Sequence, residues 1–118
     1  MMNDRVKIVQ YKDCEILCAD YTGLRGQEFL AVAEAHEALS MQSHSKELRH
    51  LIILTKAYLD ANLRKHAAEM LERLAAKGFH IKTAAVGISG IQRIILNAVK
   101  KDMYAAKTLE DAQEWLAR

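Results

Sequence analysis

The spacing of hydrophobic residues alternates between two periods along the chain, and this alternation constrains the fold more than any other feature of the sequence. Segments with the two-residue period of a strand, or with a short apolar run, stand at residues 5–10, 15–19, 51–54, 80–86 and 103–106. Segments with the 3.6-residue period of a helix stand at residues 26–43, 60–77, 91–99 and 109–116. Such alternation is typical of a sheet whose parallel strands are joined by right-handed helical crossovers.

The first two strand segments are joined differently from the rest. Only Lys12 and Asp13 separate them, and two polar residues between short strands predict an antiparallel hairpin. The wholly apolar run at residues 51–54 is typical of a strand that is covered on both faces. We therefore expect an α/β fold with the order β-β-α-β-α-β-α-β-α. The expected sheet is single, mixed and mostly parallel, with four or five strands and with helices mainly on one side.

Size and composition describe one globular domain. The chain has 118 residues, which suits a single domain over residues 1–118 with a core of its own. Hydrophobic residues make up 51% and charged residues 27% of the chain, and these fractions exclude a disordered protein. The net charge of +2 is too small to predict a nucleic-acid partner.

Two features of the sequence bear on its compartment. No apolar run approaches the roughly 20 residues of a membrane span, and the first residues lack the apolar region of a secretion signal. Cys14 and Cys18 lie on one predicted strand, where a rise of about 3.3 Å per residue separates them by roughly 13 Å, too far for a disulfide. We expect a cytoplasmic protein with free, buried thiols.

The most conspicuous candidate site is the strand-to-helix turn that contains Gly87, Ser89 and Gly90. A helix N-terminus leaves backbone N–H groups unpaired, and small residues there can admit an anion or another ligand. The same residues also suit structural roles, because Gly87 allows strand and helix to pack closely and Ser89 can cap the helix. We favour the structural roles and keep contact with an anion or ligand as the alternative.

This turn matches no catalytic motif. In the Gly-x-Ser-x-Gly elbow of hydrolases, one residue separates the serine from the second glycine, whereas Gly90 follows Ser89 directly and Ile91 occupies the glycine position. The phosphate-loop pattern Gly-x-x-x-x-Gly-Lys-Ser/Thr is also absent. No sequence feature places a general base near either cysteine, and the five histidines do not show the spacing of a zinc site. We therefore predict no catalytic residue, no metal site and no cofactor.

His36 is the unusual histidine of the sequence. It falls near the centre of the apolar face of the helix predicted at residues 26–43. A core histidine that is hydrogen-bonded or partly exposed is the common explanation for such a position. The alternative is a ligand contact: if an apolar cavity lies under this helix, His36 is the polar group that we expect in its wall.

Two segments in the second half of the chain resemble the SpoIIAA-like bacterial proteins. They read IKTAAVGISGIQRII at residues 81–95 and TLEDAQEWL at residues 108–116. The order of strands and helices over the whole chain agrees with this resemblance. That family is similar in fold to STAS domains, such as the anti-anti-sigma factors, and to the lipid-binding CRAL-TRIO fold. The resemblance implies a sheet of four or five strands with helices mainly on one side, and it implies no established activity.

The phosphorylation site of the anti-anti-sigma factors can be compared residue by residue. Those proteins carry an Asp-Ser-Ser/Thr-Gly signature where a central strand leads into its helix, and a partner kinase phosphorylates the serine. Here Asp60 matches, but Ala61 stands at the serine position and no glycine follows. Because alanine cannot accept phosphate, we expect no phosphorylation switch at this position. Thr55 and Ser89 leave room for an unusual version of the switch.

The sequence leaves several functions to weigh. The one we favour is a non-catalytic binding or regulatory module that recognises a protein partner or a small apolar or anionic ligand. The alternatives are a phosphoregulated interaction protein of the anti-anti-sigma type and a small hydrolase that uses Ser89. An exposed edge of the first strand, or the region of Trp115, could pair two copies of the chain, so a homodimer is also open.

Overall fold

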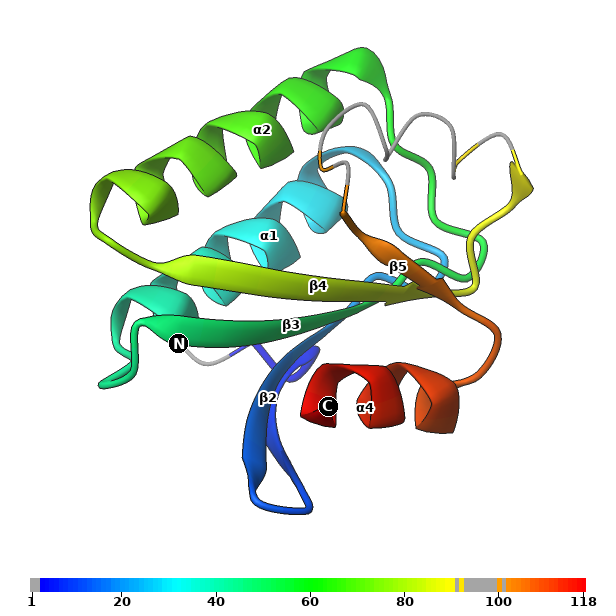
Figure 1. Ribbon diagram of the computed structural model, residues 1–118. Coiled ribbons are helices and arrows are strands. Elements are labelled where there is room, and N and C mark those ends of the chain that lie inside the picture. The colour runs from blue at the N-terminus through cyan, green and yellow to red at the C-terminus, as the bar shows by residue number, and fades with distance from the viewer. Residues whose placement is uncertain (1–2, 91, 93–99, 101) are drawn as a thin grey trace.

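A five-stranded sheet forms the centre of the protein, as seen in a computed structural model that describes residues 3–90, 92, 100 and 102–118 (Figure 1). The strands lie side by side in chain order: β1 (Val6–Tyr11), β2 (Cys14–Asp20), β3 (Glu47–Ile53), β4 (His80–Val86) and β5 (Tyr104–Ala106). The predicted α/β class and the single sheet are confirmed. The order of the strands in space was not part of the prediction.

The pairing of the strands is mixed. β1 and β2 pair antiparallel across a tight turn, in which Lys12 takes the left-handed conformation that such turns require (φ 55°). The remaining neighbours, β2 with β3, β3 with β4 and β4 with β5, all pair parallel. β3 begins at Glu47, four residues earlier than predicted. The apolar run does not indicate this start, because the first half of the strand carries charged residues and a histidine.

Helices cover both faces of the sheet. α1 (Gly26–Met41) and α2 (Ala61–Ala76) lie on one face, and α4 (Leu109–Ala117) lies on the other (Figure 1). Two of the three helices in the described part of the chain therefore share a face. The helix predicted at residues 91–99 falls outside the described residues, Gln92 excepted. No helix among the described residues is long and apolar enough to cross a membrane.

Local sequence signals set the ends of these helices. The Asp60 carboxylate accepts the Leu63 N–H at 2.8 Å and begins α2, while Gly78 follows the end of α2 with φ +89°. The Thr108 hydroxyl accepts the Asp111 N–H at 3.0 Å and begins α4 in the same way. The helices predicted at residues 60–77 and 109–116 therefore begin at side-chain caps within one residue of the predicted starts.

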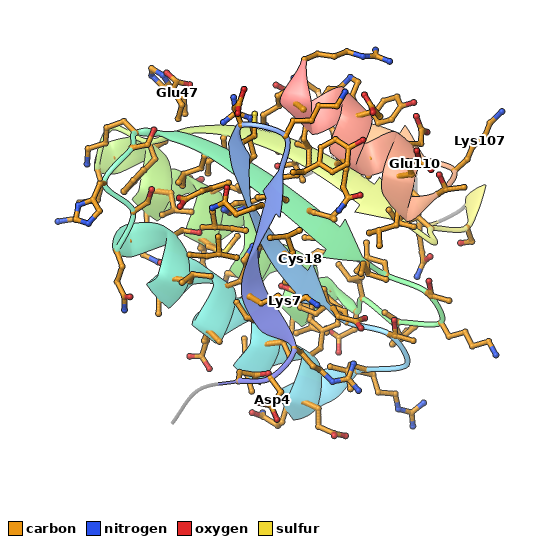
Figure 2. All side chains as sticks on the ribbon, turned by 90° about the horizontal axis from the view of Figure 1, so that it is seen from below. Asp4, Lys7, Cys18, Glu47, Lys107 and Glu110 are labelled. Atoms are coloured by element: carbon orange, nitrogen blue, oxygen red, sulfur yellow. The ribbon has the colours of Figure 1, made fainter. Side chains whose placement is uncertain are left out.

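Alternate residues of the inner strands divide the core between the two faces. In β2, Leu17 and Ala19 pack under α1 and α2, whereas Ile16 and Cys18 pack against the α4 side. Figure 2 views the α4 side, where Cys18 lies beside Lys7 of the neighbouring strand β1. Cys18 is buried, Cys14 is half-buried and both thiols are free, in agreement with the predicted spacing. The candidate site lies on the opposite face.

Candidate functional site

A cavity of about 80 Å³ lies between the sheet and the two helices that cover its upper face. Most of its wall is apolar and comes from the inner faces of α1 and α2, including Phe29, Leu30, Ala33, Leu63, Ala67 and Met70. An engineered cavity of about 150 Å³ holds benzene, and a single water needs only about 10–15 Å³ of such space. By this scale the enclosed part of the cavity has room for about three or four non-hydrogen atoms, or for several waters.

A small polar cluster is buried beneath the apolar wall. α1 brings His36 and Ser40 to one buried face because they are one helical turn apart, and β3 brings His50 against them. His36 and Ser40 are 0% exposed and His50 is 2% exposed. The two imidazole rings have their centroids 4.2 Å apart. Both histidines line the cavity.

The hydrogen bond of His36 fixes which of its ring nitrogens carries the proton. Its Nε2 lies 2.9 Å from the carbonyl oxygen of Leu17. A carbonyl can only accept, so Nε2 carries the hydrogen and donates it. Burial lowers the pKa of His36 to about 4, against a weaker opposing effect of the bond to Leu17, so the ring is neutral near pH 7. In a neutral ring with a proton on Nε2, Nδ1 is an unprotonated acceptor.

The hydrogen bonds of Ser40 determine which nitrogen of His50 carries the proton. The Ser40 hydroxyl donates its only hydrogen to the His36 carbonyl at 2.8 Å, and its oxygen lies 2.8 Å from His50 Nε2. His50 Nε2 must therefore donate to Ser40 Oγ. Burial lowers the pKa of His50 well below its usual value, and the nearby His36 and Lys100 lower it further. Two neutral imidazoles thus lie side by side in the wall of the cavity.

Two buried polar atoms in this cluster lack a partner. Within the described residues, His36 Nδ1 and Thr83 Oγ1 are the buried side-chain nitrogen and oxygen atoms that form no hydrogen bond. Thr83 is 6% exposed, lies opposite His50 in the pairing of β3 with β4, and also lines the cavity. A buried polar atom without a partner costs about 1–3 kcal/mol of stability, which makes such atoms rare in folded proteins.

Charged groups at the cavity are already paired. Arg73 of α2 donates two hydrogen bonds of 2.7 Å to the carboxylate of Glu37 on α1 and so ties the two helices together. Hydrogen bonding from Arg73 holds the pKa of Glu37 below its usual value. The ammonium group of Lys100 lies 2.7 Å from the Asp102 carboxylate. Glu37 and Lys100 both line the cavity, and each meets an opposite charge.

No protein family model, curated protein or solved structure matches this chain. The resemblance of residues 81–95 and 108–116 to the SpoIIAA-like proteins therefore stays a prediction. Across the described residues, no three histidine, cysteine, aspartate or glutamate side chains come together as metal ligands would.

The predicted turn after β4 is separate from the cavity. Among Gly87, Ser89, Gly90 and His36, only His36 lines it. Gly87 takes φ +79°, and a side chain there would meet the backbone nitrogen of Thr55 at 2.9 Å. The close approach that requires glycine is thus to the loop after β3, whereas the sequence suggested an approach of strand to helix.

Ser89 makes the contacts of a helix cap. Its hydroxyl accepts the Gln92 N–H at 3.2 Å, and its own N–H donates to the Gln92 side chain at 2.9 Å. This reciprocal pair is the capping-box pattern. Ser89 and Gly90 are exposed. Their contact with an anion stays a prediction, and so does the absence of a phosphorylation switch at Ala61, which is the first residue of α2.

A second hollow of about 260 Å³ lies on the other face, between the first three strands and α4. It is lined by Lys7 and Cys18, which Figure 2 labels, and by both acidic and apolar side chains. Burial raises the pKa of the Cys18 thiol, with Lys7 opposing and Asp20 adding to the effect. A thiol with a raised pKa stays protonated and is a poor nucleophile.

Sequence reasoning missed three members of the polar cluster. Ser40 follows His36 by four residues, so the helical period could have placed both on one face. His50 precedes the apolar run at residues 51–54, so that run alone does not place it on β3. Thr83 reads as an ordinary strand residue, and nothing in the sequence shows that β4 lies beside β3.

Proposed function

We propose that this chain is a non-catalytic binding domain whose ligand is a small, mostly apolar molecule that occupies the cavity under α1 and α2. One observation carries the proposal: the mostly apolar wall includes two buried residues, His36 and Thr83, each with a polar atom for which the described residues offer no partner. Ligand sites combine apolar walls with a few polar groups in this way. A ligand that bonds to these atoms removes a cost that the free protein carries.

The electrostatics of the cavity favour an uncharged ligand over an anion. The two buried imidazoles in its wall, those of His36 and His50, are neutral near pH 7 because burial lowers their pKa values, and His66 of α2 also lines the cavity. The ammonium group of Lys100 is paired with Asp102, and the carboxylate of Glu37 contributes a negative charge that Arg73 balances. An anion that entered would lose its hydration and would meet no unpaired lysine or arginine among the described lining residues, which is unfavourable.

The hydrogen bonds of Ser40 support a role without catalysis. Ser40 and His50 are within hydrogen-bond distance, as a serine nucleophile and its base would be. However, Ser40 donates its proton to the His36 carbonyl, and His50 Nε2 donates to Ser40. The direction is the reverse of that in an activated serine. Ser40 is also 0% exposed and does not line the cavity.

Binding of xenon to the ¹⁵N-labelled protein tests this proposal, because xenon enters apolar cavities and needs no hydrogen bond to do so. We expect backbone amide shifts at cavity residues in the native protein. Ala67→Leu fills the cavity from α2 and should abolish them. Ala75→Leu makes the same change at an exposed position of that helix and should preserve them. Equal shifts in both variants, or none in the native protein, would contradict the proposal.

A further inference from the structure

We propose that the ligand of the cavity under α1 and α2 presents a hydroxyl group to His36 Nδ1 and Thr83 Oγ1. This inference rests on the proposed function and adds the chemical class of the ligand. Both atoms are buried, both residues line the cavity, and the described chain leaves the two atoms without partners. The hydrogen-bonding capacity of each atom determines which chemical group of a ligand can bond to it.

The requirement at His36 is for a donor. The Leu17 carbonyl holds the ring proton on Nε2, which leaves Nδ1 with a lone pair that faces no protein donor in the described chain. A ketone, an ether or a carboxylate offers only acceptor oxygens, so each would leave Nδ1 unpaired. A hydroxyl group offers the hydrogen that Nδ1 lacks.

The requirement at Thr83 is compatible with the same group. A threonine hydroxyl can donate or accept, because it rotates to suit its partner. A ligand oxygen that donates to His36 Nδ1 can therefore accept a hydrogen from Thr83. A single hydroxyl that reaches both atoms would satisfy both, and the apolar walls would receive the carbon skeleton that carries it.

A cationic donor fits less well. An ammonium group could also donate to Nδ1, but it would lose its hydration without gaining an unpaired carboxylate, because Arg73 already pairs with Glu37 of the lining. The volume of about 80 Å³ also limits what is enclosed to about three or four non-hydrogen atoms. We therefore expect an alcohol whose hydroxyl end, with a short apolar stretch, is the enclosed part.

Three probes with four non-hydrogen atoms each separate these requirements. 2-Propanol donates and accepts, acetone only accepts, and acetate is a charged acceptor. We expect amide shifts at cavity residues to give a dissociation constant for 2-propanol about tenfold lower than for acetone, because only the alcohol satisfies Nδ1. Acetate should bind most weakly of the three. Equal constants for 2-propanol and acetone would overturn the inference.

Removal of the Thr83 hydroxyl provides the second arm. Thr83→Val should weaken the binding of 2-propanol several-fold while leaving xenon binding in place. Thr22→Val removes a hydroxyl from an exposed turn outside the cavity and should change neither. If xenon binds but the alcohol shows no preference over acetone, the proposed function stands and the hydroxyl inference fails. If neither xenon nor 2-propanol shifts the cavity resonances, both fail.

Discussion

Polar side chains of the inner strands lie on both faces of the sheet, half-buried on the α4 face and buried on the cavity face, and their surroundings differ. On the α4 face, Arg49 Nε donates to the carbonyl of Leu116 at 2.9 Å, and Lys82 Nζ donates to the carbonyl of Trp115 at 2.8 Å. These two carbonyls lie at the C-terminal end of α4, where a helix leaves carbonyls unpaired and favours positive charge. On the cavity face, His36 and Thr83 each keep a buried atom without a protein partner in the described chain.

The difference separates structural polar groups from groups that are available to a ligand. The bonds from β3 and β4 to α4 hold a short helix on the sheet, and Tyr11 adds a further hydrogen bond to Glu114 of the same helix. On the cavity face, two buried polar atoms lack the hydrogen bonds that would add to stability. Natural proteins give up stability in this way where a site must stay open to a ligand. Four measurements test whether the two faces differ in this way.

Acidification should have the largest effect, and it should act first on the cavity face. Burial lowers the pKa of His36 to about 4 and lowers that of His50 as well, while the unfolded chain has histidines near 6.5. Below pH 6.5 the unfolded state therefore binds more protons, and the free energy of unfolding falls with pH. The lowered pKa of His36 alone should reduce the free energy of unfolding by about 2 kcal/mol between pH 7.5 and pH 5, and that of His50 should add to this loss.

Urea unfolding at a series of pH values measures this loss. On the α4 face, hydrogen bonding from Tyr11 and Lys12 lowers the pKa of Glu114, so its contribution is lost only below the usual range of a glutamate. The fall between pH 6.5 and pH 5 thus reports on the histidines. A free energy of unfolding that stays level over this range would contradict two neutral buried imidazoles.

Ser40→Ala should give the next largest effect. The change leaves His50 Nε2–H buried without its acceptor, so we expect a loss of about 2 kcal/mol. Ser45→Ala removes a hydroxyl from an exposed turn and should cost about 0.5 kcal/mol or less. Chemical denaturation of both variants makes the test. A cost as small for Ser40→Ala as for Ser45→Ala would show that the cluster is not held as described.

Arg49→Met should have a smaller effect, on the α4 face alone. It keeps the apolar stem of the side chain and removes the bond to the Leu116 carbonyl, for a loss of about 1 kcal/mol. Its affinity for 2-propanol should equal that of the native protein. Denaturation and the alcohol titration together check both points, and an altered affinity would mean that the two faces are not independent.

Thr83→Val should have the smallest effect, with the opposite sign. The free protein loses an unpaired buried hydroxyl and gains a methyl group of similar size, so its free energy of unfolding should rise by up to about 1 kcal/mol. Thermal unfolding without added alcohol measures the change. A loss of stability as large as that of Ser40→Ala would mean that the hydroxyl has a partner in the free protein.

The hydrophobic periods predicted much of the fold because local signals agree with it. Strand alternation, the caps at Asp60 and Thr108, and Gly78 each act within a few residues of the chain. The start of β3 was missed because Arg49 reads as a surface residue, although its guanidinium reaches the end of α4, 67 positions away in the chain. Contacts between residues so far apart in the chain do not affect the local spacing of hydrophobic residues.

The site was predictable only in part for the same reason. His36 stood out because a titratable residue on an apolar helix face is unusual, and a cavity does lie beside it. Leu17 of β2, which bonds to His36, lies beside His50 of β3, and His50 lies beside Thr83 of β4, so strand pairing brings the three residues together. The glycines and the serine of the turn at residues 87–90 predicted either structural roles or contact with a ligand. In the structure, Gly87 allows a close backbone approach and Ser89 makes the contacts of a helix cap.

The protonation of His36 is the most direct test of the binding site. Long-range ¹H–¹⁵N spectra of the labelled protein at pH 7 report both ring nitrogens. We expect Nε2 to carry the proton and Nδ1 to resonate as a bare nitrogen, which then shifts as a hydrogen-bond acceptor when 2-propanol is added. A proton on Nδ1 in the free protein, or an Nδ1 resonance that does not respond to the alcohol, would contradict a hydroxyl-binding cavity.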